Sequence, residues 1–215
     1  MFVERLVVGP YQTNCYIMGN EENSSAWIID PGNEGSRIIK AIENHNVKPV
    51  AVLLTHTHWD HITALGELKE RYPHLEILVS EEDSHYLGSQ AYERFSKSCF
   101  DKSFLQRYEK ELKAMSEATG FLTDNQLLHD SHLLVMHTPG HTQGGICLYH
   151  EQGQFVFTGD TLFAGSIGRT DLEGGSYDEI VRSCKRLLSL PLEVQVLPGH
   201  GPATTIGGEQ NNPYL

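Results

Sequence analysis

Four metal-ligand side chains fall within six positions, directly after one short apolar segment. The segment Pro49–Leu54 is partly β-branched, which predicts a buried strand. Thr55 follows, and then His56-Thr57-His58-Trp59-Asp60-His61. Folding alone does not require this density of imidazole and carboxylate groups, and together they suit Zn, Fe or Mn. The sequence therefore predicts a metal site at the end of a strand.

The spacing within this motif divides its ligands into two pairs. If the extended backbone continues through His58, the side chains of His56 and His58 point to the same side and can reach one ion. Asp60 and His61 come next, where a helix is predicted over 61–71 with Asp60 as its N-cap. For any single histidine, a polar loop role is the alternative. The four ligand-type residues together favour metal binding.

Length and composition limit the classes of protein to consider. The chain has 215 residues of which 39% are hydrophobic, and this predicts one globular domain spanning residues 1–215. A net charge of -12 and a pI near 5.4 argue against nucleic acid or an anionic membrane as a partner. Neither of these partners is therefore expected, and the oligomeric state is open.

Two features bear on the compartment. No apolar segment approaches the roughly 20 residues that span a bilayer, and Met1–Arg5 lacks the pattern of a secretion signal. Cys15, Cys99, Cys147 and Cys184 are scattered, which favours buried thiols over disulfides. We therefore expect a cytoplasmic protein.

The apolar pattern predicts strands first and then alternating helices and strands. Three β-rich segments separated by Gly- and Pro-containing turns predict an antiparallel start. The segment at about 81–128 predicts two or three helices that form a lid or flank, and its aromatic residues fit local packing at least as well as substrate contact. Strands are predicted at 2–8, 13–18, 25–29, 50–54, 75–79, 133–137, 146–149, 155–158 and 194–197, with other helices near 38–42 and 180–188.

Three later strand ends each carry a further ligand-type residue. His141, Asp160 and His200 stand in the turns Thr138-Pro139-Gly140-His141, Thr158-Gly159-Asp160 and Pro198-Gly199-His200. Glycine lets the backbone bend sharply, so that a side chain at a strand end can face a common cleft. These turns are therefore expected to converge on the His56–His61 motif.

With these motifs in view, the chain resembles the metallo-β-lactamase superfamily, and within it the glyoxalase II group of thioester hydrolases. The resemblance covers nearly the whole chain. It implies an α/β (α+β) fold of the αββα sandwich type with the site along one edge. The motifs that carry it are His56–His61, His137–His141, Gly159–Phe163, Gly168–Asp171 and Pro198–Gly201.

The resemblance also implies a ligand set for two divalent ions, with Zn expected and Fe or Mn as alternatives. Two neighbouring ions lower the pKa of a shared water and stabilise the oxyanion that forms on an acyl substrate. Asp60 is expected to be catalytic as well, by orienting that water. The implied ligands are His56, His58 and His141 for one ion, Asp60, His61 and His200 for the other, and Asp160 as the bridge.

The chain departs from the glyoxalase II pattern in two places. The sequence ends at Leu215 without the helical C-terminal domain of the long form, and Gly145 stands where the family often has a second histidine. Arg169 matches the position of a basic residue near the carboxylate of the thiol cofactor. A substrate contact through Arg169 and an ion pair with Asp171 or Glu173 are equally consistent with the sequence.

The leading hypothesis is a dinuclear hydrolase of a small thioester, such as S-lactoylglutathione. The alternative is a mononuclear iron persulfide dioxygenase, which the motifs Asp60–Thr63 and Gly168–Asp171 also resemble. β-Lactam hydrolysis is less favoured, because Asp160 stands where a cysteine would be expected. A binding module without catalytic activity has no need for seven such ligands.

Overall fold

The computed structural model describes residues 1–20, 24–98 and 102–215, which form two compact units. The N-terminal unit comprises Met1–Val79 and Ser84–Phe121. The C-terminal unit comprises Ser80–Asp83 and Leu122–Leu215. The prediction of a single domain over residues 1–215 is not tested by this division and stays a prediction.

The N-terminal unit contains a six-stranded sheet in the order β1-β2-β3-β4-β5-β6. β1, β2 and β3 pair antiparallel, which confirms the predicted antiparallel start, and β3 to β6 pair parallel. The alternation of buried and exposed residues in β1 and the nearly continuous burial of β2 and β3 account for this order, because inner strands are covered on both faces. The strands are β1 (Phe2–Val8), β2 (Thr13–Asn20), β3 (Ser25–Ile29), β4 (Lys48–Leu53), β5 (Glu76–Val79) and β6 (Gly120–Phe121).

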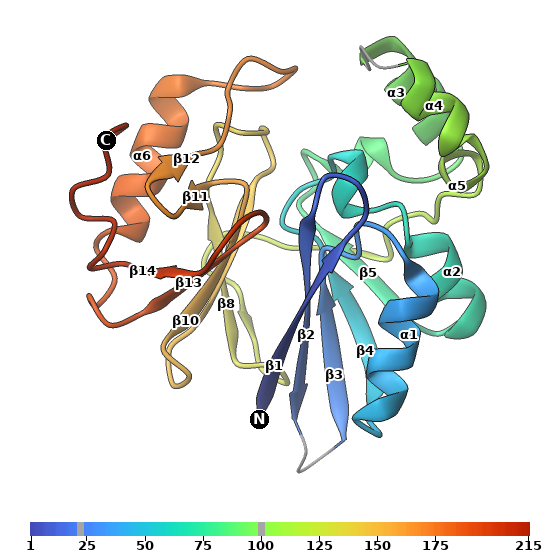
Figure 1. Cartoon of the computed structure of the whole chain (residues 1–215), viewed down its shortest axis with the longest axis horizontal. Helices are drawn as coiled ribbons and strands as arrows, with labels where there is room; N and C mark the ends of the chain where they lie inside the picture. The colour runs from blue at the N-terminus through green and yellow to red at the C-terminus, as the bar shows by residue number, and fades with distance from the viewer. Residues whose placement is uncertain (21–23, 99–101) are drawn as a thin grey trace. The chain divides into compact units, whose positions relative to one another are not determined.

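Helices flank this sheet. Figure 1 shows α1 (Gly35–Asn44) and α2 (Leu65–Arg71) beside β3, β4 and β5. The predicted helical segment at 81–128 contains the short η2 (Ser84–Tyr86) and the helices α3 (Ala91–Ser98), α4 (Lys102–Arg107) and α5 (Glu109–Lys113). The prediction of two or three helices is therefore confirmed. Phe95, Leu105 and Leu112 from these helices are buried in the core of the N-terminal unit, as the packing explanation of this segment requires.

The helix predicted over 61–71 is wrong at its start. A single 3-10 turn, η1 (Trp59–His61), comes first, and α2 begins only at Leu65. Asp60 lies inside η1 and is not an N-cap; the N-cap residues are His58 for η1 and Ala64 for α2, and neither makes a side-chain cap. The Asp60 carboxylate instead accepts a hydrogen bond from Thr13, so it is oriented by a tertiary contact.

The C-terminal unit contains a second six-stranded sheet in the order β14-β13-β10-β9-β8-β7, together with the hairpin β11-β12. Figure 1 shows α6 (Tyr177–Leu187) beside this hairpin. The amphipathic pattern explains the helix, since Ile180, Cys184 and Leu187 face a core that includes Val156 and Val196. The strands are β7 (Leu127–Leu128), β8 (Leu133–His137), β9 (Ile146–His150), β10 (Phe155–Gly159), β11 (Leu162–Phe163), β12 (Ser166–Ile167), β13 (Gln195–Pro198) and β14 (Thr204–Thr205).

The cysteines behave as predicted where the structure describes them. Cys15, Cys147 and Cys184 are buried free thiols, and Cys99 lies outside the described residues. Burial raises the pKa of Cys15, and it raises the pKa of Cys184 to about 12, so both stay protonated at neutral pH. Within 1–20, 24–98 and 102–215, no helix has the length and apolar character needed to cross a membrane.

Candidate functional site

The strand β4 leads directly into the first ligand motif. After Leu53 the chain continues through Leu54 and Thr55 to His56 and His58, and then turns through η1 to Asp60 and His61. The imidazole rings lie close together, with centroids 4.9 Å apart for His56 and His58 and 4.1 Å apart for His56 and His61. The N-terminal unit therefore gathers its four predicted ligands in one turn, which we call the N-terminal half-site.

Asp30 connects two parts of this half-site, and sequence reasoning missed it. It follows β3 in a left-handed conformation (φ 50°) and is only 1% exposed. Its Oδ1 accepts a hydrogen bond from the Thr55 backbone N–H at 2.8 Å, and its Oδ2 accepts from Thr55 Oγ1 at 2.6 Å. The same Oδ2 lies 3.0 Å from His61 Nδ1. One buried carboxylate thus fixes the backbone before His56 and the ring of His61.

These hydrogen bonds determine which nitrogen of each ring carries a proton. His61 Nδ1 must donate to the Asp30 carboxylate, which has no proton to give. The Thr55 hydroxyl donates to Asp30, so at 3.1 Å from His56 Nδ1 it can only accept. In both rings Nδ1 is therefore the donor, and the neutral form of each ring has its lone pair on Nε2. A metal-binding histidine is held in this way, with the other ring nitrogen donating to a carboxylate or another acceptor.

Asp30 itself is better described as an orienting residue than as a ligand. Donor atoms of Asp30, His56 and His61 lie within 4.8 Å of one another, a spacing that a metal ion could use. Both Asp30 oxygens, however, already accept hydrogen bonds from Thr55 and His61. The signal in the sequence was the triplet Asp30-Pro31-Gly32, which predicted only a turn.

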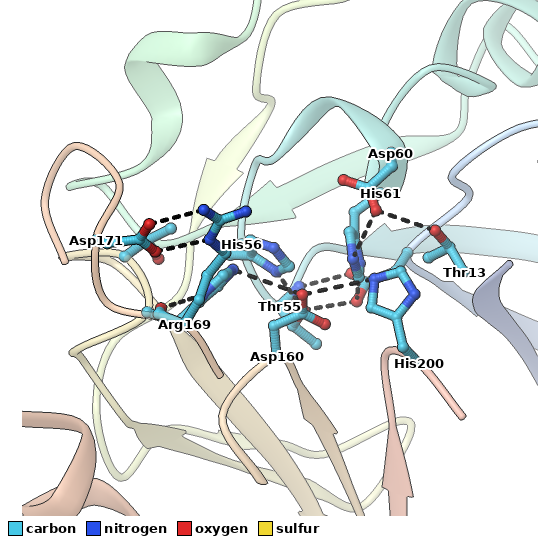
Figure 2. Close-up of polar contacts among 12 residues, drawn as sticks. Thr13, Thr55, His56, Asp60, His61, Asp160, Arg169, Asp171 and His200 are labelled. Atoms are coloured by element: carbon cyan, nitrogen blue, oxygen red, sulfur yellow. Dashed lines mark hydrogen bonds and ion pairs between the residues drawn. The ribbon is translucent and has the colours of Figure 1, made fainter. Parts of the chain in front are cut away.

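Asp60 is held in a defined position from two sides. Its Oδ2 accepts a hydrogen bond from Thr13 Oγ1 at 3.2 Å, as Figure 2 shows, and lies 3.7 Å from His61 Nε2. Donor atoms on a tetrahedral ion with bonds of about 2.1 Å are about 3.4 Å apart, so this separation is close to that of two ligands. Gly32 packs against the backbone of the same turn, because a Cβ atom there would lie 1.8 Å from the Asp60 carbonyl oxygen.

This close approach gives a matched pair of substitutions. We expect Gly32→Ala to lower the free energy of unfolding by about 1–3 kcal/mol or more, because the backbone of the ligand turn must move. In contrast, Gly66→Ala in α2 should be neutral or stabilising by up to about 1 kcal/mol, since its Cβ would only approach Ala114 O at 3.8 Å. Urea unfolding of both variants measures this. Equal stability of the two would contradict the predicted close packing at Asp60.

The C-terminal unit carries the other three predicted ligands at strand ends. Asp160 follows β10 and His200 follows β13, and because these strands are parallel neighbours, their C-terminal ends lie at the same edge of the sheet. His141 lies in the turn after β8. Asp160 Oδ2 is 3.5 Å from His141 Nε2 and 3.5 Å from His200 Nε2, and Figure 2 shows it beside His200. We call these three residues the C-terminal half-site.

The His141 ring is oriented as the N-terminal rings are. Its Nδ1 lies 2.8 Å from the Arg169 carbonyl oxygen, which can only accept, so Nδ1 is the donor and the neutral ring has its lone pair on Nε2. Nε2 lies beside the Asp160 carboxylate. An oxygen equidistant from two imidazole nitrogens, near the spacing of about 3.4 Å between ligands of one ion, is what a metal-bridging carboxylate needs.

Asp83 supports the turn that carries His141. It is 3% exposed, and its two carboxylate oxygens accept hydrogen bonds from Thr142 Oγ1 and Gly144 N–H, each at 2.8 Å. No motif marked Asp83 in the sequence, because its partners lie 59 and 61 residues away. Like Asp30, it is a buried carboxylate that holds a ligand-bearing turn.

Arg169 makes an ion pair within its own turn. Its Nε and one terminal nitrogen each lie 2.7 Å from an oxygen of Asp171, as Figure 2 shows. This bond lowers the pKa of Asp171 to about 2 and raises the pKa of Arg169. The structure therefore contains the ion pair that was one of the two roles inferred from the sequence, and the substrate contact stays a prediction.

The donor set of each half-site fits a divalent cation. Three histidines have Nδ1 bonded to an acceptor, which leaves Nε2 as the atom for a metal, and the carboxylates of Asp60 and Asp160 lie beside imidazole nitrogens at 3.5–3.7 Å. Neutral imidazole and carboxylate are the ligands that Zn, Fe and Mn share. Metal binding by the seven predicted residues stays a prediction at this point.

Three comparisons with known proteins bear on this arrangement. The profile of the metallo-beta-lactamase superfamily matches residues 8–200. The hydroxyacylglutathione hydrolase GloC of Haemophilus influenzae is 34% identical, over 100% of this chain and 98% of its own length. Two crystal structures are similar throughout: BLEG-1 B3 metallo-beta-lactamase (TM-score 0.86, 32% identity, 100% of this chain and 99% of the other) and TTHA1623 in a di-iron-bound form (0.80, 34%, 99% and 100%).

These matches confirm two predictions from the sequence. The resemblance to this superfamily is correct, and so is the α/β fold class with helix-flanked sheets. They do not test the individual site residues.

Proposed function

Because the chain belongs to the metallo-beta-lactamase superfamily, we propose that it is a dinuclear metal-dependent hydrolase of a small thioester. The observation that carries the proposal is the position of Asp160, whose Oδ2 lies 3.5 Å from the Nε2 atoms of both His141 and His200. A carboxylate oxygen between two imidazole nitrogens suits a bridge between two ions.

In this proposal His56, His58 and His141 would hold one ion, Asp60, His61 and His200 would hold the other, and Asp160 would bind both. Zinc is the expected metal, and iron is the leading alternative because the similar protein TTHA1623 was crystallised in a di-iron-bound form. The ions would also offset the negative charges of Asp60 and Asp160.

When bound, the ions supply Lewis-acid activation of a water molecule and of the thioester carbonyl. The protein residues then have separate tasks. Asp60 orients the attacking water, and Thr13 holds the Asp60 carboxylate in place through its hydrogen bond. Asp30 keeps the His61 Nδ1 protonated, so that Nε2 stays available. The reaction adds water across the thioester bond and releases a carboxylic acid and a thiol.

The thioester is supported by the similarity to GloC, whose name states that it hydrolyses hydroxyacylglutathione. Arg169 is the proposed contact for a substrate carboxylate. Asp171 takes the Nε and one terminal nitrogen of the guanidinium, so a ligand carboxylate would bind through the remaining N–H groups or replace Asp171.

The alternative activity is a mononuclear iron persulfide dioxygenase, which the motifs at Asp60–Thr63 and Gly168–Asp171 also resemble. The two activities differ in their need for oxygen. Thioester cleavage needs only water, whereas a dioxygenase consumes O₂ together with its persulfide substrate.

We expect metal-loaded protein to hydrolyse S-lactoylglutathione at the same rate in air and in an anaerobic chamber. Release of free thiol measures this, and an oxygen electrode with glutathione persulfide measures the alternative. A cephalosporin chromogenic substrate serves as the control for β-lactam cleavage, since BLEG-1 is a B3 metallo-beta-lactamase. Rapid oxygen uptake without thioester cleavage would show that the activity is that of the dioxygenase. Cleavage of the β-lactam alone would show that the substrate is a β-lactam and not a thioester.

A further inference from the structure

Three aromatic rings from three separate segments of the N-terminal unit meet beside the ligand turn. Trp59 is the first residue of η1 and stands between His58 and Asp60 in the sequence. Tyr11, from the turn between β1 and β2, lies edge-on to Trp59 with ring centroids 4.4 Å apart. Tyr108, at the start of α5, is stacked against Trp59 at 6.5 Å. We call these three residues the aromatic cluster.

The aromatic cluster is only partly explained by packing. Trp59 and Tyr108 are half-buried and contact the core of the N-terminal unit, so one side of each ring has a structural role. Tyr11 is different. It is 48% exposed and stands in a hydrogen-bonded turn over Gly9–Gln12 that is outside the core. Tyr11 thus lies on Trp59, the side chain between two predicted ligands, with about half of its own surface open to solvent.

A hydrogen bond links the start of β2, directly after the turn that carries Tyr11, to the Asp60 carboxylate. Thr13, two residues after Tyr11, donates through Oγ1 to Asp60 Oδ2 at 3.2 Å. The residue that follows this turn therefore holds the carboxylate that we propose orients the attacking water. Tyr11 and the residue that holds the Asp60 carboxylate are close in the sequence, and Trp59 precedes Asp60 directly. A substrate bound at Asp60 would therefore have aromatic rings beside it.

We propose that Tyr11, Trp59 and Tyr108 form an apolar subsite for the acyl group of the substrate, and that the enzyme prefers thioesters whose acyl group carries an aromatic ring. This inference rests on the proposed function and specifies its substrate class. Offset and edge-on contacts between aromatic rings favour binding by about two- to tenfold each beyond the burial of area. A small polar acyl group makes no such contact.

The first test compares S-phenylacetylglutathione with S-acetylglutathione on the metal-loaded enzyme. We expect kcat/KM to be higher for the phenylacetyl ester by about tenfold, and Tyr11→Ala to reduce this ratio by about fivefold through KM. Tyr214→Ala, which removes a tyrosine of similar exposure in the C-terminal unit, is the matched control and should keep the wild-type ratio. Equal kcat/KM values for the two esters, or an unchanged ratio in Tyr11→Ala, would overturn the proposal.

A third ester places the ring on the other side of the sulfur. S-benzyl thioacetate carries a benzyl thiol and a small acyl group. We expect its kcat/KM to be affected little by Tyr11→Ala. A Tyr11-dependent preference for this ester would assign the aromatic cluster to the thiol and overturn the assignment to the acyl group.

The second test does not depend on hydrolysis. The chain contains two tryptophans, and Trp27 is 5% exposed in β3, so Trp27→Phe leaves Trp59 as the sole indole fluorophore. We expect phenylacetate, the product acid, to change the emission of this variant at about tenfold lower concentration than acetate does. If no thioester is cleaved but phenylacetate still binds selectively, the proposed function fails and the subsite stands. Equal responses to both acids would reject the subsite.

Discussion

Replacing His58 by alanine is expected to lower thioester hydrolysis by about three orders of magnitude while the fold is retained. His58 is half-buried in the loop after β4, and it is not part of either hydrophobic core. Loss of one imidazole ligand removes several kcal/mol of stabilisation that the ion gives to the transition state, and each 1.36 kcal/mol is tenfold in rate. The stability of the sheets and helices below the loop should change little.

Circular dichroism and urea unfolding measure the fold, and thiol release measures the rate. His74→Ala is the control, since His74 is an exposed histidine outside both half-sites. It should match the wild type in both measurements. If His58→Ala keeps most of the hydrolysis, His58 is not a ligand, and a fall in rate accompanied by global unfolding would show that the loop contributes to stability more than we infer.

Asp30→Ala is expected to have the largest effect on stability. The substitution leaves three buried donors without their acceptor: the Thr55 backbone N–H, the Thr55 hydroxyl and His61 Nδ1. Each unsatisfied buried group costs about 1–3 kcal/mol, and breaking a buried charged network costs about 3–5 kcal/mol, so we expect a loss of about 3–5 kcal/mol in the free energy of unfolding. Metal affinity should fall by about 10- to 100-fold, because the His61 ring loses its orienting carboxylate.

Urea unfolding and competition with a chromophoric chelator measure these two effects separately. Asp30→Asn keeps the shape of the side chain but has one acceptor oxygen instead of two, so it should fall between the alanine variant and the wild type. Asp130→Ala removes an exposed carboxylate and should change stability by less than about 0.5 kcal/mol. An Asp30→Ala protein as stable as Asp130→Ala would show that the Asp30 network contributes nothing to the fold.

Elements with a strong local pattern could be predicted from the sequence. The strands at Phe2–Val8, Ser25–Ile29 and Leu133–His137 have the predicted bounds, because β-branched and apolar residues run between clear turn signals. The strands β6, β7, β11, β12 and β14 have two residues each and were not predicted. Such short strands are defined by the partner that pairs with them, and a short segment contains no periodicity.

The candidate site shows the same division between local and distant information. The ligand-type residues could be identified because each stands in a short motif at a strand end. The residues that orient them could not, since Asp30 lies 25 residues from Thr55 and 31 residues from His61. The predicted N-cap role of Asp60 was wrong for a related reason: the local pattern favoured a cap, and the hydrogen bond from Thr13, 47 residues away, is absent from any local window.

Elemental analysis of protein purified without chelator tests the central claim most directly, because the two-metal site is what distinguishes the proposed hydrolase from the dioxygenase. We predict about two divalent metal ions per chain in the wild type, and about one or fewer in Asp160→Ala, since the proposed bridging carboxylate is lost. The wild-type result should be accompanied by thioester hydrolysis that does not depend on oxygen. One iron per chain, unchanged in Asp160→Ala and accompanied by rapid oxygen consumption with glutathione persulfide, would contradict the account.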